Sequence, residues 1–450
     1  MRAHLTKSTT SARPALIDVV GRLTVVNGFV MLLAFASGPI LARALGPDGR
    51  GNLAAILLPV TLAPVVFSFG LTTYVTRQAA RGRSPALLMG SIGPLVLGLG
   101  VFAALLGPSV AALFAGGRDV VHTFVLVGFL LMPVSLFGWL LHSFALGLER
   151  WRMVVAAQVI SAVVSTAAIV VLYVLGSLTV ASTAIVMFAT GSLAAIPLLP
   201  LIREAGRPRF RREVVRESLP FGLKAWVGGL GSVANVRLDQ LLMTRLVEPR
   251  ELGLYVVAFT VSNFFLNPVL GALTSGMLPR FASGDSALIA RVLRTMIAAV
   301  ALIGALIALG APLIIYVLFG GAFADALPLA WLLLVATVPF AGLTVLSTAL
   351  TSSGHPGFGA SAEMVTLLVT VPCLLLALST YGATAAAVTS IVAYSAGFVW
   401  LLFGGRRHLQ LGLRELLVIR REDIAWVLDI LRTRASAGWR SVVGRLRRSS

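Results

Sequence analysis

The sequence contains few of the residues on which metalloenzymes and disulfide-linked proteins depend. Its only cysteine, Cys373, lies in a hydrophobic run, so the chain has no disulfide framework and a thiol metal site is not expected. None of the five histidines stands at metal-ligand spacing from another, and the i, i+4 histidine pair of a zinc-binding helix is absent. We therefore expect neither a metal ion nor a cofactor.

Charged residues are also scarce, and most of them have one sign. They make up 12% of the 450 residues, with 36 Lys and Arg against 17 Asp and Glu. A net charge of +19 would suggest a nucleic-acid partner for a soluble protein. Here the basic residues lie in the loops between long hydrophobic segments, which indicates membrane topology instead. We expect no nucleic-acid partner.

Long hydrophobic segments fill most of the chain. Hydrophobic residues make up 58% of it, and the mean hydropathy is +0.95. The segments have the length of a membrane-crossing helix and lack the alternating period of a β-barrel strand. This predicts an all-α polytopic membrane protein with twelve transmembrane helices. The expected spans are 23–41, 53–75, 87–106, 120–146, 154–174, 178–202, 219–242, 254–278, 295–319, 327–350, 359–378 and 383–403.

The most hydrophilic internal stretch divides the spans into two sets of six. The expected parts are a cytoplasmic N-terminal arm (1–22), an N-terminal lobe (23–202), a basic cytoplasmic linker (203–218), a C-terminal lobe (219–403) and a basic amphipathic tail (404–450). With the N-terminus in the cytoplasm, 29 of the 36 Lys and Arg residues lie inside and five lie outside. This asymmetry predicts that both termini are cytoplasmic.

Both ends of the chain are basic. The N-terminal arm precedes a run of full span length without a small-residue cleavage site, which indicates a first span and not a signal peptide. In the tail, apolar residues from Leu413 onward fall on one helical face. We expect the tail to lie on the inner membrane surface and to bind anionic lipid, with a partner-binding helix as the alternative.

A short motif of Arg, Pro and Gly, each four residues apart, occurs twice in the chain. Both copies lie between hydrophobic segments, and internal repeats in membrane bundles are typical of transporters. We interpret the motif as structural, with Arg at the outer helix end, Pro starting a short linker and Gly permitting the turn into the next span. Its residues are Arg43, Pro47, Gly51, Arg245, Pro249 and Gly253.

Several sequence pieces resemble one transporter family. They are residues 40–47 (Ile-Leu-Ala-Arg-Ala-Leu-Gly-Pro), 219–222 (Leu-Pro-Phe-Gly), 237–242 (Arg-Leu-Asp-Gln-Leu-Leu), 251–255 (Glu-Leu-Gly-Leu-Tyr) and 278–280 (Leu-Pro-Arg). In this order they are similar to the pattern of the oligosaccharide flippases, the O-antigen and exopolysaccharide translocases of the multidrug/oligosaccharidyl-lipid/polysaccharide exporter superfamily. The resemblance runs with gaps from about residue 20 to 405.

The resemblance implies a fold and a function. Two six-helix lobes would face each other in a V around a central cavity that opens alternately to the two sides. The function implied is secondary transport without catalysis, in which a polyprenyl-diphosphate-linked oligosaccharide is flipped across the bacterial cytoplasmic (inner) membrane for cell-surface polysaccharide biosynthesis. A polysaccharide polymerase or another assembly protein would be a partner.

Ionisable side chains inside the spans are candidates for substrate binding, because each costs roughly 2.5 to 3.5 kcal/mol to insert. Arg237 has a guanidinium that matches phosphate oxygens and stays charged, so we expect it to face the cavity and bind the diphosphate. Pairing across helices for packing is the alternative. Lys224, one turn into span seven, is expected to recruit substrate at the cavity mouth, with snorkelling to the interface as the alternative.

Carboxylates and amides complete the candidate site. Asp239 or Glu363 could couple transport to H⁺ or Na⁺, and a structural hydrogen bond between helices is the alternative. The amides could bind sugar hydroxyls, although hydrogen bonds between helices are the simpler role. They are Asn27, Asn235, Asn263 and Asn267.

Other functions make different demands on the sequence. A lipid II flippase commonly has two extra C-terminal spans, where this chain has an amphipathic tail. A drug or cation antiporter would need carboxylates in the N-terminal lobe, whose spans contain no Asp or Glu in their interiors. A membrane glycosyltransferase would need sizeable exposed loops. An acyltransferase would need an intramembrane histidine, and His122 and His142 are 20 residues apart in span four.

Overall fold

The computed structural model describes residues 12–264, 270, 281, 285–409, 412–418 and 420–423, without the side chains of 12–25 and 409. Every regular element in this part is helical, which confirms the predicted all-α class. The elements are α1 (Ala12–Phe67), α2 (Leu71–Ala80), α3 (Pro85–Ala115), α4 (Asp119–Leu130), α5 (Met132–Gly147), α6 (Trp151–Val174), α7 (Val180–Leu193), η1 (Ile196–Leu198), α8 (Pro200–Ala205), α9 (Arg212–Leu246), α10 (Pro249–Phe264), α12 (Ser286–Ile314), η2 (Ile315–Phe319), η3 (Gly321–Phe323), α13 (Ala326–Ser352), α14 (Pro356–Leu409) and α15 (Leu413–Leu417).

Seven helices of the described residues are long and apolar enough to cross a membrane, or up to eight if the bent α4–α5 pair is one span. Two of them, Val26–Phe67 and Pro356–His408, would extend over about 60 and 80 Å, against a hydrocarbon core of about 30 Å. Gly46 (φ 66°) and Gly382 (φ 52°) break the helical backbone within them. Glycine adopts this left-handed conformation at little cost, so each long helix supplies two of the predicted spans.

Predicted spans four and six are single hydrophobic segments in the sequence, and each is divided in the structure. α4 and α5 meet at a bend of 51°. Pro133 lies in the first turn of α5, where its missing N–H breaks no helical hydrogen bond. Span six consists of α7, η1 and α8, and Pro197 and Pro200 lie at the starts of the last two. Proline positions, which a hydropathy window ignores, therefore set these breaks.

Contacts divide the chain into two compact units. Unit 1 consists of Met1–Val257 and Ile315–Asp325, and unit 2 consists of Ala258–Ile314 and Ala326–Ser450. Unit 1 includes α9, the predicted first helix of the C-terminal lobe, because α9 contacts α1, α2 and α3. The predicted lobes, 23–202 and 219–403, stay a prediction. The V-shaped arrangement of the lobes stays a prediction as well.

Unit 1 has a hydrophobic core shared by α2, α3, α5, α6 and α8. Leu88, Leu140 and Phe144 are among its buried side chains. The basic linker is fastened to this unit, since the Arg209 N–H donates to the Ala86 carbonyl at 3.0 Å. A Cβ on Gly90 would overlap the backbone of Arg209, so glycine allows the linker to lie directly on α3.

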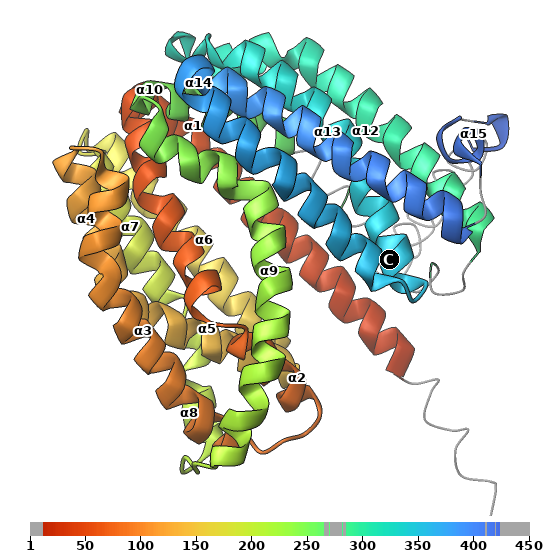
Figure 1. Cartoon of the computed structure of the whole chain (residues 1–450). Helices are drawn as coiled ribbons and strands as arrows, with labels where there is room; N and C mark the ends of the chain where they lie inside the picture. Colours follow the sequence, from red (N-terminus) through yellow and green to blue (C-terminus); the bar gives the residue numbers. More distant parts are fainter. Residues whose placement is uncertain are drawn as a thin grey trace, which may run out of the picture. The chain divides into compact units, whose positions relative to one another are not determined.

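Unit 2 contains α12, α13 and α14, which run side by side (Figure 1). Small residues allow their close approach, as a Cβ on Gly342 would overlap the ring of Phe398. The first part of the tail packs on α12 through a two-pronged ion pair of Arg294 with Asp423, at 2.7 and 2.8 Å. The prediction that the tail lies on the membrane concerns mainly residues 424–450, which lie outside the described residues.

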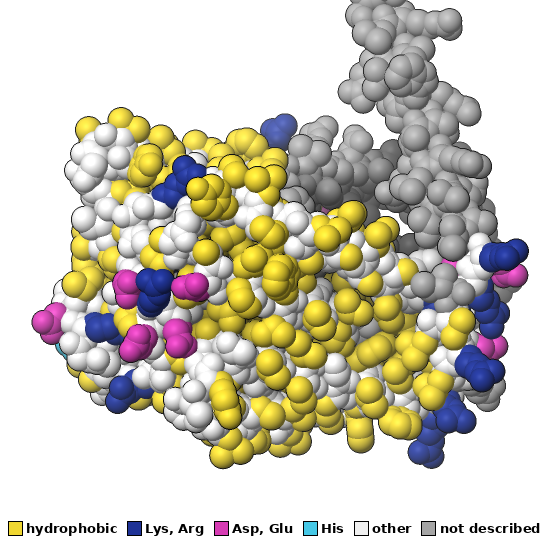
Figure 2. Space-filling view, turned by 90° about the horizontal axis from the view of Figure 1, so that it is seen from above, with side chains coloured by type: hydrophobic (Ala, Val, Ile, Leu, Met, Phe, Trp, Pro, Cys, Tyr) yellow, Lys and Arg dark blue, Asp and Glu magenta, His cyan; other side chains and the backbone are white. Residues whose placement is uncertain are grey.

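The exterior is strongly hydrophobic. Leu309 and Leu376 are each 80% exposed. Figure 2 shows a mainly hydrophobic face on which Lys, Arg, Asp and Glu gather in groups at the margins. A soluble monomer rarely exposes so much contiguous apolar surface. Together with the long apolar helices, this makes the chain a multi-pass membrane protein.

Candidate functional site

The two copies of the repeated motif pack against each other. A Cβ on Gly51 would overlap the Pro249 carbonyl oxygen, and a Cβ on Gly253 would overlap the Pro47 carbonyl oxygen. The contact is reciprocal, because equivalent positions of the two copies exchange roles. Both glycines lie in helices, and the left-handed backbone occurs at Gly46 instead. The prediction that Gly51 and Gly253 permit a turn is therefore wrong: they permit two helices to touch through their backbones.

The motif arginines lie at helix ends. Arg43 is exposed, and its guanidinium donates a hydrogen bond to the Val317 carbonyl in η2. Arg245 lies in the last turn of α9, where a cation interacts favourably with the helix dipole. Arg250, in the first turn of α10, pairs with Asp325 at 3.1 Å. These contacts join the outer loops of unit 1.

Arg118 fastens the C-terminal end of α9. From the sequence it is identified only as one of five basic residues in the outer loops. Its guanidinium donates to the Thr244 carbonyl of α9 at 2.7 Å and to Asn52 Oδ1 of α1 at 3.1 Å. It also donates to the Ala115 carbonyl at the end of α3 at 2.8 Å. Burial, and then the charge of Arg245, lower the pKa of Arg118 from its usual value.

The N-terminal end of α9 is fastened by a polar cluster that the sequence analysis missed. Arg83 Nη1 lies 2.5 Å from Glu217 Oε2, and the Tyr74 hydroxyl lies 3.0 Å from Arg83 and 3.2 Å from Glu217. The Arg83 guanidinium lowers the pKa of the Glu217 carboxyl. Gly70 and Gly222 bring the backbones together, since a Cβ on Gly70 would overlap the Gly222 carbonyl. The only sequence signal for this pair is that Arg83 and Glu217 have opposite charges and both lie on the predicted cytoplasmic side.

Aromatic contacts strengthen the same end of α9. The Trp226 indole N–H donates to the Val66 carbonyl at 2.8 Å, and its ring stacks on Phe69 at a centroid distance of 5.0 Å. The Arg77 guanidinium carbon lies 4.7 Å from the centre of the Phe221 ring. α9 is therefore attached to the first-half helices at both of its ends.

Two predicted residues of α9, Arg237 and Asp239, both contact Gln240 of the same helix. Arg237 is half-buried and donates to Gln240 Oε1 at 3.1 Å. Asp239 is buried, and one carboxylate oxygen accepts from the Gln240 N–H at 2.7 Å. The other oxygen accepts from the Tyr255 hydroxyl of α10. Asp239 thus forms an interhelical hydrogen bond inside unit 1.

The other candidates are distributed over both units. Lys224 is exposed and Asn235 is half-buried, both on α9, while Asn27 is exposed on α1. In unit 2, Asn263 donates to the Phe259 carbonyl of its own helix at 3.1 Å. Glu363 is half-buried on α14, and Asn267 lies outside the described residues. The structure therefore gathers on α9 the residues Lys224, Asn235, Arg237 and Asp239.

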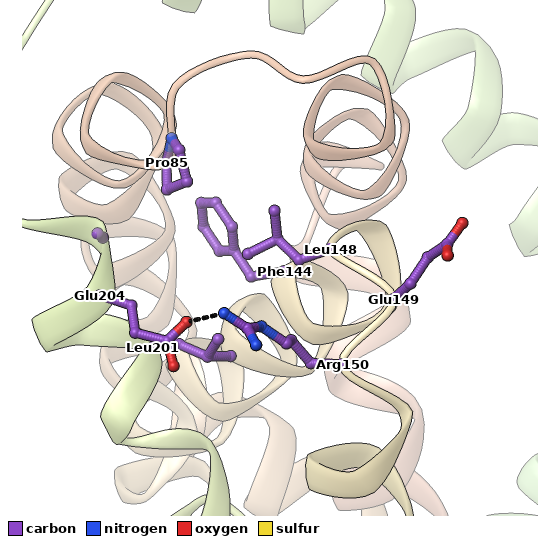
Figure 3. Close-up of a pocket in the computed structure, with 8 residues that line it drawn as sticks. Pro85, Phe144, Leu148, Glu149, Arg150, Leu201 and Glu204 are labelled. Carbon is purple, nitrogen blue, oxygen red and sulfur yellow. Dashed lines mark hydrogen bonds and ion pairs between the residues drawn. The ribbon is translucent and has the colours of Figure 1, made fainter.

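A pocket of about 400 Å³ lies between α5 and α8 at the predicted inner end of unit 1, and it contains none of the predicted residues. Figure 3 shows Phe144, Leu201 and the ion pair of Arg150 with Glu204, at 2.7 Å, along its lining. The side chain of Glu149 points away from the others. Because Arg150 and Glu204 neutralise each other, this ion pair provides no net charge to attract a charged ligand. The described residues contain no group of three or more His, Cys, Asp or Glu that could hold a metal.

The comparison with known proteins decides the family. The family described as Polysaccharide biosynthesis protein matches residues 17–285. This match covers more than half of the chain, including α9 and both copies of the repeated motif. The chain belongs to this family. No curated protein sequence matches this family member.

Solved structures show that this polysaccharide biosynthesis family member shares the fold of known transporters. The lipid II flippase MurJ, in an inward closed conformation, is 12% identical with a TM-score of 0.69, over 91% of this chain and 92% of that one. An inward-facing MATE family multidrug resistance transporter of the MOP superfamily is 15% identical with a TM-score of 0.68, over 85% and 94%. The MATE multidrug transporter DinF-BH is 13% identical with a TM-score of 0.61, over 93% and 100%. Family and fold together support a flippase or transporter role.

Proposed function

We propose that the protein flips a polyprenyl-diphosphate-linked oligosaccharide across the cytoplasmic membrane of a bacterium by alternating access. The observation that carries the proposal is the match to the polysaccharide biosynthesis family on a fold shared with a lipid II flippase. In this proposal the glycan is built on a lipid carrier inside the cell and used outside it. A polytopic protein of this family has the architecture to move them between the two leaflets.

The charges of α9 support an anionic head group as the substrate. Arg237 is half-buried on α9, and Lys224 lies exposed about three and a half turns nearer the helix start. A guanidinium matches the oxygens of a diphosphate, and an exposed lysine attracts the same anion as a point charge. In this proposal Lys224 recruits the diphosphate and Arg237 binds it further along the helix. Asn27, Asn235 and Asn263 are proposed to contact the glycan.

The membrane potential supports outward movement of such a substrate. A diphosphate with about two negative charges gains roughly 5 kcal/mol per 100 mV on leaving a negative interior, if the protein does not cancel its charge. Coupling to H⁺ or Na⁺ through Asp239 or Glu363 is the second proposed drive. The hydrogen bond from Tyr255 to Asp239 would then have to break or change in each cycle.

The surroundings of the protein follow from the same proposal. Both termini are proposed to be cytoplasmic, which the excess of Lys and Arg in alternate loops supports. The basic tail is proposed to bind anionic lipid there. A polymerase or another assembly protein would receive the glycan on the outer side.

Drug export is the second candidate function, because a MATE transporter structure is almost as similar as the lipid II flippase. Against it, the predicted spans of the first half contain no Asp or Glu with which to bind a cation. The two functions differ in what a cell without the protein accumulates. A strain lacking the gene should accumulate a polyprenyl-linked glycan on the inner leaflet, detectable by mass spectrometry of its lipid extract. An unchanged pool of lipid-linked glycans, together with increased drug sensitivity, would contradict the flippase proposal.

A further inference from the structure

A second pocket of unit 1, which we call the α2–α5 pocket, has several polar side chains in a partly apolar lining. Its volume is about 510 Å³, within the roughly 300–1,000 Å³ of ligand-binding pockets. α2 runs toward the predicted cytoplasmic loop that contains Arg81 and Arg83, so the pocket lies on the cytoplasmic side of the predicted topology. The lining residues that matter most are Thr72, Thr73, Thr76, Arg77, Trp139 and His142.

The Thr76 hydroxyl joins the two helices of the pocket, and the Ser143 hydroxyl donates to the Trp139 carbonyl at 2.8 Å. Thr76 Oγ1 lies 3.1 Å from the Thr72 carbonyl of α2 and 3.1 Å from the Ser143 carbonyl of α5. The side chains of Thr72, Thr73 and His142 make no hydrogen bond within the described part of the chain. Hydroxyls donate and accept, and a neutral imidazole does both through its two nitrogens. Such a mixture suits the hydroxyls of a sugar.

Arg77 of this pocket and Lys224 of α9 have no carboxylate partner among the described residues. Arg77 lines the pocket and rests on the ring of Phe221, 4.7 Å from its centre. Lys224 is three residues beyond Phe221 on α9 and therefore shares its face of the helix. Both basic side chains are exposed. A pair of unneutralised cations attracts a phosphate.

Trp139 gives the pocket an aromatic wall. Its side chain is 44% exposed. The indole N–H groups of Trp226, Trp331 and Trp400 each donate to a protein oxygen. Those of Trp139 and Trp151 donate to none of the described residues, and only Trp139 lines this pocket. The negative face of an indole ring attracts the polarised C–H groups of a pyranose, and its N–H can bind a sugar oxygen.

We propose that the α2–α5 pocket is an entry site that binds the first sugar of the lipid-linked glycan. Trp139 stacks on the sugar ring, Thr72, Thr73 and His142 bind its hydroxyls, and Arg77 with Lys224 holds the adjoining phosphate. The inference rests on the proposed function and adds a sugar-reading site in the first half of the chain.

The test measures binding to the full chain in phosphatidylcholine nanodiscs, where no anionic headgroup competes for Arg77. The probes are farnesyl diphosphate alone and farnesyl diphosphate carrying glucose, galactose or N-acetylglucosamine, each titrated by calorimetry. At least one sugar-bearing probe should bind about tenfold tighter than farnesyl diphosphate. This gain in affinity is what one or two additional hydrogen bonds to the sugar are expected to contribute. Trp139→Leu and Thr73→Val should each reduce this preference, whereas Arg77→Gln should weaken all four probes.

Trp331→Leu is the matched control, because Trp331 is similarly exposed but lies in unit 2. It should leave all affinities unchanged, and melting temperatures should show that each variant is folded. Equal affinity for all four probes, or an undiminished sugar preference in Trp139→Leu, would overturn the sugar site while leaving the proposed function intact. A wild-type protein that binds none of the probes would contradict the proposed function itself.

Discussion

Gly51 and Gly253 allow the two copies of the repeated motif to pack against each other. Their repeated spacing is visible in the sequence, and it leads to the prediction that the chain has two related segments. The sequence alone does not reveal that the two copies touch, because a motif repeated along the chain gives no information on distance in space. At both positions a hydrogen atom in place of a side chain lets two helices touch through their backbones.

Replacing Gly253 by alanine is expected to destabilise the protein by about 1–3 kcal/mol, because the new methyl group would overlap the Pro47 carbonyl. The detergent-solubilised variant should melt at a lower temperature in a fluorescence scan. Gly229→Ala is the control, since nothing lies within 4 Å of a Cβ at that position on α9. It should be neutral or slightly stabilising, as alanine suits a helix interior. Equal melting temperatures for the two variants would contradict the contact between the copies.

A pH effect is expected where the tail meets α12. The side chains of Asp423 and Arg294 are 1% and 5% exposed, and the guanidinium lowers the pKa of the Asp423 carboxyl. A carboxyl with a lowered pKa in the folded state adds stability above its unfolded pKa of about 4 and loses it as pH falls through the folded value. Hydrogen exchange of residues 412–423, corrected for intrinsic rates, should therefore stay slow from pH 7 to 5 and accelerate below about pH 4.

At pH 7 the same segment should exchange faster in Asp423→Asn, by an amount corresponding to up to about 3 kcal/mol. Glu422→Gln removes a neighbouring carboxylate that is 77% exposed and 3.9 Å from Arg291, so it serves as the control. Surface pairs of this kind contribute little. If both variants exchange alike, the buried ion pair does not hold the segment.

At the scale of elements, hydropathy predicts that α9 is a span but does not predict which helices it packs against. The sequence predicts a span at 219–242 and identifies its unusual charges, and the structure places Lys224, Arg237 and Asp239 on it as expected. Its neighbours depend on contacts between residues more than 100 positions apart, such as Arg83 with Glu217 and Arg118 with Thr244. Side-chain pairing at that separation leaves no periodic signal in a single sequence.

The contact between α2 and α9 is expected to open during transport, because alternating access requires helices from the two halves to separate at one end. Cysteines replacing Arg83 and Glu217, in a Cys373→Ser background, should be joined by a short bifunctional thiosulfonate reagent. Joining them should stop most flipping, and reductant should restore it. The control pair replaces Arg150 and Glu204, a 2.7 Å ion pair between first-half elements only. Full activity of the joined α2–α9 pair would show that this contact stays closed throughout the cycle.

At the scale of the whole molecule, the class of protein was predictable because bilayer thickness and backbone hydrogen bonding restrict a chain of this composition to helices. The breaks at Gly46 and Gly382 fall between predicted spans, whereas the bend at Pro133 falls inside the predicted span 120–146 and was not predictable from hydropathy, because a hydropathy window ignores proline position. Substrate-binding residues were chosen for the cost of placing charge in a membrane. That criterion selects Arg237 as a candidate and gives no weight to the threonines and Trp139 of the α2–α5 pocket, which cost little to insert.

The central claim is that this protein moves a lipid-linked glycan between leaflets, and reconstitution tests it most directly. Polyprenyl-diphosphate-linked oligosaccharide isolated from the deletion strain is placed in liposomes with the purified protein, and its exposure to an added glycosidase is followed over time. Wild-type protein should expose the inner-leaflet pool far faster than protein-free liposomes do. Arg237→Ala should slow this movement by about tenfold, the loss of one charge-assisted hydrogen bond. Movement no faster than in protein-free liposomes would contradict the claim.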